Sequence, residues 1–509
     1  MVHYYPSAAH LPQTKMQKEQ TMNKSLWRPA AIALAALSVL SIAPQSSQAT
    51  SPPPPLMEKA EKAENARERF IPIETLTTKS GIDVWFVEDR SVPVLSIKFF
   101  FENVGAAYDG ADKQGLARLV SNTLDEGAGS YDAKAFQKAL NDYSISLSFG
   151  SGRDDFSGQL KTLTRYQDKA FELLKLALNE PRFDDEAVTR MREANIARIK
   201  SSLSDPSWLA ARLFNDTFYG DHPYALNSGG TISALNALTA DDLRAYVARS
   251  LTRDRLHVAV TGAINKNQLL DAIDDIFGDL PEHAESAPAP IAPFTWPKSG
   301  KSALYHIDGL PQSKIMLALP SVRIDDPRYY TMKLMTTILG GSGFGSRLME
   351  EIREKHGLTY GIYSYTSESD ASEMMHIVAS SQNATVAELL SRTMGELKRM
   401  ADTPVSEEEL KAHRDYLIGS MPLTLTSTDQ ISGLMQQLQM QNLPADYLDH
   451  RADALRKVTV DDIQTLAKEI LDDEKVIAVV AGGIKAKDIP GTATGVYNFT
   501  VVSELPNVE

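Results

Sequence analysis

The sequence predicts an α+β protein made of two homologous halves, each a mixed β-sheet layered with helices. The first observation is an internal duplication. Residues 238–264 align without a gap with residues 458–484, and both read as a capped amphipathic helix, a polar turn and a buried strand that ends in glycine. The second is that residues 183–193 match residues 405–415 in the same order and at nearly the same spacing. Long helical patterns follow strand patterns in both halves, which favours a layered α/β domain that occurs twice.

The expected elements follow the hydrophobic pattern in chain order. Runs rich in Ile, Val and Phe predict strands, and apolar residues at helical spacing predict helices. In the first half we expect strands at residues 82–87 and 94–101, a helix at 113–126 and a strand at 145–149. In the second half we expect a strand at 314–319 and a helix at 329–339, followed by a glycine-rich turn and another helix.

Changes in composition divide the chain into five parts. A proline-rich stretch at residues 281–298 reads as a linker between the homologous halves at residues 70–280 and 299–509. Residues 50–69 combine a run of prolines with a charged segment, which predicts an extended tether, with a proline-rich recognition ligand as the alternative. Residues 1–49 are expected to be a signal peptide.

The signal peptide is indicated by a short basic region, an apolar stretch at residues 30–43 and small residues at Ser47 and Ala49, the two positions that a signal peptidase reads. The apolar stretch is shorter than the roughly 20 residues that cross a bilayer core, which favours cleavage over an uncleaved membrane anchor. Because residues 1–21 are polar, translation could begin at Met22 or Met16. We therefore expect export to a bacterial periplasm and no stable membrane span.

The composition excludes several functions. The chain has 509 residues, no cysteine and a formal net charge of −14, from 52 Lys plus Arg against 66 Asp plus Glu. Nucleic acid binding needs clustered positive charge, so we expect no nucleic acid partner. Without cysteine there is no disulfide, thiol nucleophile or cysteine-ligated zinc. The ten histidines are scattered, and no HExxH, HxxEH or GxSxG motif occurs.

A glycine-rich run at residues 340–346 raises the question of phosphate binding. The run follows a helix instead of a strand, and no Gly-Lys-Ser/Thr comes after it, so nucleotide binding is disfavoured. The alternative is a turn between two helices in which the glycines adopt positive φ angles.

Arg353 and Tyr360 lie in the helix and strand that follow this run. Arg353 is near the expected end of the helix, and Tyr360 opens a tyrosine-rich strand. A guanidinium beside a phenol could hold a peptide carbonyl or a tetrahedral oxyanion. The helix carries many other charges, however, and the residues alone favour a solvated face.

The duplicated halves and the string GGSGFGSRLMEEIREKHGLTYGIYSY resemble the insulinase/pitrilysin-type zinc peptidases, peptidase family M16. The similarity is greatest to the short, two-chain bacterial branch that is related to mitochondrial processing peptidase, and it covers about residues 70–490. The resemblance implies that the two halves form half of a clamshell. It also places Arg353 and Tyr360 on the Arg and Tyr, seven residues apart, that the family uses to hold substrate at the scissile bond.

The zinc motif of the family is degenerate in this chain. The family's HxxEH follows Gly-Leu-Ala, which is present here, but its two histidine positions are Arg118 and Asn122 and its glutamate position is Ser121. The third ligand, a glutamate, should fall near residues 197–198, where no carboxylate occurs. Zinc needs three protein donors to hold a catalytic water. The resemblance therefore implies the fold without bound metal and without activity of the chain alone.

The resemblance also implies a role. Two-chain members of the family pair an HxxEH subunit with a subunit that carries the Arg/Tyr motif, and this chain has the second pattern. We expect a non-catalytic, substrate-binding subunit of a periplasmic heterodimeric zinc metallopeptidase that degrades unstructured peptides. Zinc would sit on the partner subunit, and Arg353 and Tyr360 would reach its site. An exposed edge strand near residues 144–149 could take the peptide by strand addition. The alternatives are a peptidase-derived scaffold or interaction protein and an autonomous hydrolase with an unrecognised site.

Overall fold

The computed structural model describes residues 69–286, 288–341, 345–489, 499–505 and 508–509. The residues from Arg69 to Glu509 form one compact unit. The predicted signal peptide at residues 1–49 and nearly all of the tether at 50–69 lie outside the described residues. Among the described residues, every helix is too short or too polar to cross a bilayer.

The first half contains a six-stranded mixed sheet with the order β1-β2-β8-β3-β7-β6. Strand β8 runs parallel to β2 and antiparallel to β3, and β6 is an edge strand that, among the described strands, pairs only with β7. The strands are β1 (Glu74–Thr77), β2 (Asp83–Glu88), β3 (Val94–Phe101), β6 (Ser146–Ser151), β7 (Phe156–Leu163) and β8 (Leu256–Gly262), with a small separate pair, β4 (Gly127–Ala128) and β5 (Tyr131–Asp132).

The second half repeats this topology in five of its six strands, in a sheet with the order β11-β12-β10-β13-β9-β14. The sixth strand, β14, differs from β1, because it comes last in the chain and runs parallel to its neighbour β9, whereas β1 is antiparallel to β2. Strand β13 is parallel to β9 and antiparallel to β10, as β8 is to β2 and β3, so the edge strand β11 corresponds to β6. The predicted fold class, two homologous α/β layered halves, is confirmed. The strands are β9 (Ser302–His306), β10 (Gln312–Pro320), β11 (Ile362–Ser369), β12 (Ser372–Gln382), β13 (Ile477–Gly482) and β14 (Thr500–Val502).

The helices also follow one order in both halves. Those of the first half are α1 (Leu116–Ser121), α2 (Ala133–Asp142), α3 (Gln167–Asn179), α4 (Asp185–Ser202), α5 (Pro206–Tyr219), α6 (Ile232–Ala237), α7 (Ala240–Ser250) and α8 (Lys266–Phe277). Those of the second half are α9 (Tyr329–Gly340), the π-helix η6 (Met349–Lys355), α10 (Val386–Asp402), α11 (Glu407–Ser420), α12 (Thr428–Met440), α13 (Tyr447–Lys457) and α14 (Val460–Ile470). In chain order, α3 to α7 correspond to α10 to α14.

The duplicated segments fold alike down to their hydrogen bonds. Thr239 and Thr459 cap α7 and α14, and each donates its backbone N–H to the side chain of the aspartate three residues on, at 2.9 Å in both cases. This capping box satisfies amide groups that the first helical turn leaves open. The strand that follows ends at Gly262 or Gly482, with φ of 146° and 152°. A Cβ there would approach the neighbouring strand to 2.3 or 2.4 Å, so both positions require glycine.

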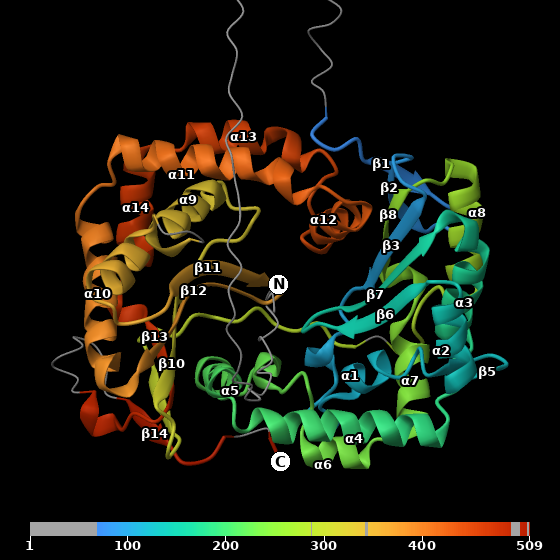
Figure 1. Cartoon of the computed structure of the whole chain (residues 1–509), viewed down its shortest axis with the longest axis horizontal. Helices are drawn as coiled ribbons and strands as arrows, with labels where there is room; N and C mark the ends of the chain where they lie inside the picture. Colours follow the sequence, from blue (N-terminus) through green and yellow to red (C-terminus); the bar gives the residue numbers. More distant parts are fainter. Residues whose placement is uncertain (1–68, 287, 342–344, 490–498, 506–507) are drawn as a thin grey trace, which may run out of the picture. The chain divides into compact units, whose positions relative to one another are not determined.

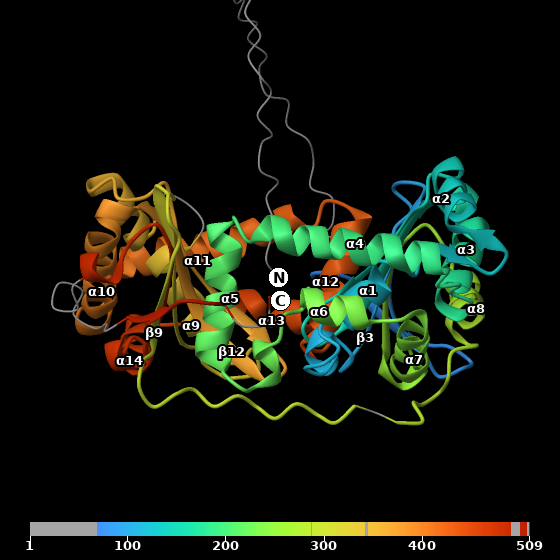
Figure 2. The ribbon, with the colours of Figure 1, turned by 90° about the horizontal axis from the view of Figure 1, so that it is seen from below.

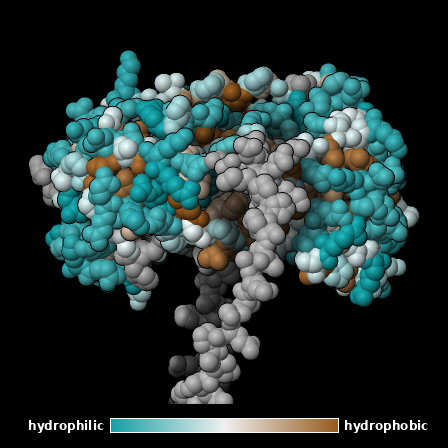
Figure 3. Space-filling view, turned by 90° about the horizontal axis from the view of Figure 1, so that it is seen from above, coloured by the Kyte–Doolittle hydropathy of each residue, from teal (hydrophilic) through white to brown (hydrophobic). Residues whose placement is uncertain are grey.

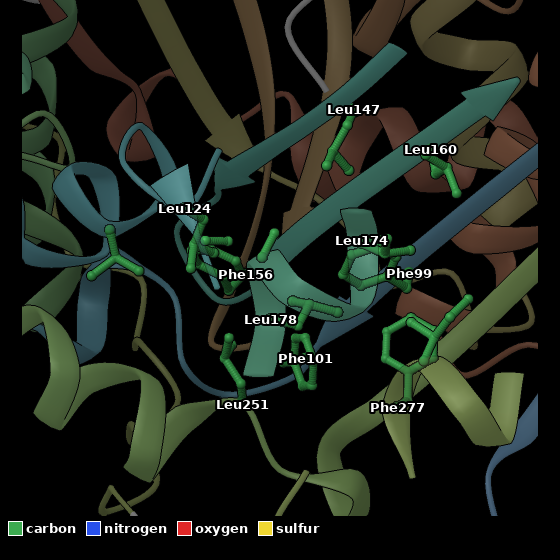
Figure 4. Packing of buried hydrophobic residues seen from close by; sticks show 14 of the residues in the cluster. Phe99, Phe101, Leu124, Leu147, Phe156, Leu160, Leu174, Leu178, Leu251 and Phe277 are labelled. Carbon is green, nitrogen blue, oxygen red and sulfur yellow. The ribbon is translucent and has the colours of Figure 1, made fainter. Parts of the chain in front are cut away.

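The core of the first half lies between the sheet and the helices α1, α3, α7 and α8. Phe99 and Phe277 pack edge to face with ring centroids 5.1 Å apart, and Phe101 lies beside them (Figure 4). Gly158 makes room for this cluster, because a Cβ on it would lie 2.1 Å from the Phe99 ring. On the face drawn in Figure 3, hydrophilic residues predominate and hydrophobic ones form small separate patches.

Each half lends one helix to the sheet of the other half. Helix α12 packs on β3 and β8 of the first half, and its counterpart α5 packs on β9, β10 and β13 of the second (Figure 1). Polar side chains fix the first contact, since Gln436 donates to the Phe99 carbonyl at 3.0 Å and Gln439 to the Val258 carbonyl at 3.3 Å. This exchange covers both faces of the central strands and explains why β13 is buried along its whole length.

Two further features concern the connections between elements. The described residues between Phe277 and Ser302 contain no helix or strand, and Figure 2 shows them as an extended crossing from α8 to β9.

The helix predicted at residues 113–126 is shorter than expected. It starts only at Leu116, because the Asp109 carboxylate accepts bonds from the backbone of Gly115 and Ala117 and holds the preceding turn.

Candidate functional site

The degenerate zinc motif lies at α1, where Ser121 bonds to its own helix and Asn122 bonds to a neighbouring one. Ser121 is 2% exposed and donates its hydroxyl to the Arg118 carbonyl at 2.9 Å. Asn122, just after the helix, donates its amide to the Asn195 side-chain oxygen at 2.8 Å. Asn195 is 3% exposed and belongs to α4.

The contact between Asn122 and Asn195 corrects the predicted position of the third ligand. We expected it near residues 197–198, but Ala197 and Arg198 are exposed on α4, whereas Asn195 faces α1. The physical reason is helical periodicity: Asn195 is one turn before the buried Ile199 and shares its face. This spacing was readable in the sequence. Arg118, Ser121, Asn122 and Asn195 are named the degenerate zinc set from here on.

The degenerate zinc set does not fit a zinc ion. It offers a guanidinium, a hydroxyl and two amides, whereas zinc takes imidazole, thiolate or carboxylate donors. The Arg118 cation would also repel a divalent metal. In the part of the chain that the structure describes, no cluster of three or more metal-ligating side chains is found. The degenerate zinc set therefore supports no catalytic step through a metal.

The segment that carries Arg353 winds as a π-helix, η6, and not as the expected α-helix. Its wide turn buries Met349 and Ile352, and it ends where the Leu358 amide donates to the Ile352 carbonyl at 3.0 Å. Gly357 provides the left-handed turn that follows, with φ of 62°. Single π-turns are rare and occur frequently at functional sites. Arg353 pairs with Glu354 at 3.1 Å, and its side chain is 29% exposed.

Tyr360 follows that turn and is 93% exposed, which is unusual for a tyrosine. Its neighbours are held firmly. Thr359 is bonded to the Ser380 carbonyl at 2.7 Å, and a Cβ on Gly361 would lie 2.7 Å from the Tyr363 hydroxyl. The backbone of Tyr360 is therefore anchored on both sides while the side chain projects freely.

Arg353 and Tyr360 line one cavity of about 780 Å³. The cavity exists because β11 is shorter than β12 at this end of the sheet. Its first pair joins Ile362 to Ala379, whereas β12 continues for three more residues that pair only with β10. Those residues, 380–382, form the floor of the cavity, and the turn from Gly357 to Gly361 forms one wall. The structure thus brings the two predicted substrate-binding residues to one site and leaves the degenerate zinc set outside it.

Lys314 is a lining residue that sequence reasoning missed. It lies on β10 directly opposite Ser380, and burial lowers the pKa of its ammonium group. The sequence showed it only as a polar residue at the start of a strand. Its position beside Arg353 depends on strand pairing, which local patterns do not reveal.

The glycine run behaves differently from the prediction. Gly341 has φ of −61°, and neither Gly340 nor Gly345 is among the residues with positive φ. Close approach explains the first two instead. A Cβ on Gly340 would lie 2.7 Å from the Ser364 amide, and one on Gly341 would lie 2.7 Å from the Thr337 carbonyl. The middle of the run, 342–344, lies outside the described residues.

These features define a class of protein: a duplicated peptidase-type fold in which the metal residues are replaced, while Arg353 and Tyr360, predicted to hold substrate, line one cavity. Comparison with known proteins agrees. Residues 91–232 match the family model described as insulinase (peptidase family M16), and residues 237–417 match the one described as peptidase M16 inactive domain. The chain belongs to peptidase family M16, as a non-catalytic member.

Some relatives are named as non-peptidase homologues and others as zinc proteases. A non-peptidase homolog, YmxG of Helicobacter pylori, is 24% identical over 412 residues, which cover 80% of this chain and 94% of the relative. An uncharacterized zinc protease, YmxG of Bacillus subtilis, is 21% identical, covering 80% and 98%. The crystal structure of a peptidase M16 inactive domain from Pseudomonas fluorescens superposes with a TM-score of 0.74 at 26% identity, covering 82% of this chain and 99% of that one.

Proposed function

We propose that this chain is the substrate-holding subunit of a periplasmic heterodimeric zinc peptidase that degrades unstructured peptides. The observation that carries the proposal is the contrast between the two sites. The degenerate zinc set cannot hold the metal, whereas Arg353 and Tyr360 share a cavity large enough for several residues of an extended peptide. A partner of the same family that has HxxEH would supply the zinc and the general base.

The exposed phenol of Tyr360 suits it to act on atoms of another chain. Its hydroxyl would donate a hydrogen bond to the scissile carbonyl and hold the oxyanion that develops on attack by water. Such a donor is worth about 10²-fold or more in rate when it is aimed at the oxyanion. Arg353, fixed by η6 and Glu354, would orient the substrate backbone or Tyr360 itself.

The first half would contribute a binding edge. Strand β6 (Ser146–Ser151) pairs with β7 on one side only, so its other side presents unpaired backbone groups. An extended peptide could add to it as a further strand and gain main-chain hydrogen bonds that do not depend on sequence. This position agrees with the predicted edge strand at residues 144–149, and it favours unstructured peptides because most backbone groups of a folded chain are already paired.

The test begins with native mass spectrometry of the tagged chain recovered from its host, with bound metal quantified. We expect a one-to-one complex with a similar-sized chain that carries one zinc. In the reconstituted pair, Tyr360→Phe and Arg353→Ala should each lower kcat by about 10²-fold. Tyr416→Phe, on the exposed face of α11 and outside the cavity, is the matched control and should leave the rate unchanged.

The outcomes separate the proposal from its rivals. A metal-free monomer or homodimer that binds no peptide would indicate a scaffold or interaction protein. Peptidase activity of the pure chain that survives a chelator would indicate an autonomous hydrolase. Full activity of the Tyr360→Phe pair would show that the phenol does not act on the substrate.

A further inference from the structure

The cavity beside Tyr360 has a charge pattern opposite to that of the whole chain. Its lining residues include two cations, Lys314 and Arg353, and no aspartate or glutamate. The chain as a whole carries 66 acidic against 52 basic residues. The remainder of the lining is glycine, aliphatic side chains, hydroxyls and amides. The cavity is therefore a positively charged site in an acidic protein.

Strand pairing fixes the direction in which Lys314 points. It pairs with Ser380 on β12 and with Ala481 on β13, so it lies in the interior of the sheet. Its neighbours along β10, Ser313 and Ile315, are each 1% exposed on the opposite face. The alternation of a strand therefore places the Lys314 side chain on the face that carries the cavity.

The Lys314 ammonium is partly desolvated and has no acidic partner. It makes no ion pair or hydrogen bond with any residue that the structure describes. Burial lowers its pKa, and the field of Asp205 opposes that shift without forming a contact. Asp205 is occupied elsewhere, since it caps α5 by accepting the Ser207 amide at 2.9 Å.

A desolvated cation without a partner lowers the stability of the folded chain, and an anion bound beside it reduces that loss. Arg353 differs in this respect, because Glu354 already lies 3.1 Å from it. Lys314 is thus the lining cation best placed to attract a carboxylate. In a cavity that holds peptide, the carboxylates available are aspartate and glutamate side chains and the C-terminal group.

We propose that Lys314 receives a carboxylate of the bound peptide and that the cavity therefore selects acidic segments. This inference rests on the proposed peptide binding and adds the charge preference to it. A charge-assisted hydrogen bond in a partly dehydrated site strengthens binding more than a neutral one. The preference would place an acidic residue, or the end of the peptide, next to the position held by Tyr360.

The test uses four fluorescent twelve-residue unstructured peptides and measures Kd by anisotropy with the purified full chain. One sequence carries three glutamates, and the other carries glutamines at the same positions. Each sequence is made once with a free C-terminus and once with an amidated one. Lys314→Met keeps most of the length of the side chain and removes its charge. Lys468→Met, on the exposed face of α14, makes the same change in net charge away from the cavity.

We expect Lys314→Met to weaken binding of the glutamate peptides about tenfold, leave the glutamine–amide peptide unchanged and leave the melting temperature at or above that of the parent chain. Lys468→Met should change none of these values. If the loss follows the glutamates, the carboxylate is a side chain. If it follows the free C-terminus, the terminal group is the ligand.

Two results would overturn the inference and are distinguishable from each other. If the peptides bind, and Tyr360→Ala weakens them all, but Lys314→Met affects acidic and neutral peptides equally, then peptide holding stands and the carboxylate site is wrong. If no peptide binds the chain, and Tyr360→Ala has no effect in the reconstituted pair either, then the proposed function fails together with the inference.

Discussion

Asp155→Asn should flatten the dependence of stability on pH. Asp155 lies in the β6–β7 turn, whose backbone carbonyls accept bonds from the amides of residues 104–107 and whose Asp154 carboxylate accepts the Asp370 amide of the β11–β12 hairpin. In that turn the Gly152 amide donates to the Asp155 carbonyl at 2.8 Å. Burial raises the pKa of the Asp155 carboxyl to about 8, and the nearby Asp370 and Asp154 add to the shift. Burial also raises the pKa of Asp370, to about 6.

The sign follows from proton binding. The unfolded chain releases the Asp155 proton near its ordinary pKa of 3.8, whereas the folded chain keeps it up to about pH 8. Between these values the folded state binds more protons at this group, so the contribution of Asp155 to stability is greatest below pH 4 and declines as the pH rises. One such group contributes a slope of about −1.4 kcal/mol per pH unit, or about 3 kcal/mol between pH 5 and 7.

The assay is urea unfolding followed by circular dichroism at pH 5, 6 and 7. The amide cannot ionise, so the free energy of unfolding of Asp155→Asn should fall less steeply with pH than that of the parent chain. Asp112→Asn, at an exposed position of the same half, is the matched control and should retain the parental slope. Equal slopes for the parent chain and Asp155→Asn would refute the assignment of a buried, protonated carboxyl to this turn.

Three other predictions test the packing and the lost metal site. Gly158→Ala should lower the unfolding free energy by about 1–3 kcal/mol in urea titration, because the new methyl would overlap the Phe99 ring; an unchanged midpoint would contradict the packing. Gln436→Ala should lower it by about 1 kcal/mol through loss of the bond across the halves, while the exposed Gln437→Ala should not. Converting the degenerate zinc set to His, Glu, His and Glu should create zinc binding, measured after dialysis. With the last glutamate at Arg198 instead, retention should be lost, and equal retention would reject the α1–α4 geometry.

Sequence patterns predicted the elements of this fold where one segment and its duplicate agree. Residues 239–242 and 459–462 each contain a complete capping box, and the glycines that end the following strands are required by the close approach of a neighbouring strand. Such features depend on a few adjacent residues. The exchange of α5 and α12 was not predictable in this way. Each helix shows one apolar face, but its sequence does not indicate which sheet that face will cover.

The site was predicted only in part, and for a related reason. Arg353 and Tyr360 were found through the resemblance, whereas Lys314 is brought to them by the pairing of β10 with β12. The third-ligand position was expected near residues 197–198, two or three positions beyond Asn195, whose side chain lies on the face of α4 toward α1. A count along the chain fails at any small insertion, while the buried face of α4 is fixed by packing.

The departures from local expectation gather around the cavity, and that distribution supports a binding role. The segment of Arg353 winds as a π-helix, Tyr360 is almost fully exposed, and Lys314 carries a charge in the interior of a sheet without an acidic partner among the described residues. Each feature lowers the stability of the unbound protein, and contact with a bound chain would offset that loss. At the degenerate zinc set the opposite holds, since the Asn122–Asn195 bond closes the site on itself. In a scaffold that had lost all function, destabilising features would not be expected to persist around the cavity while the degenerate zinc set is closed by hydrogen bonds.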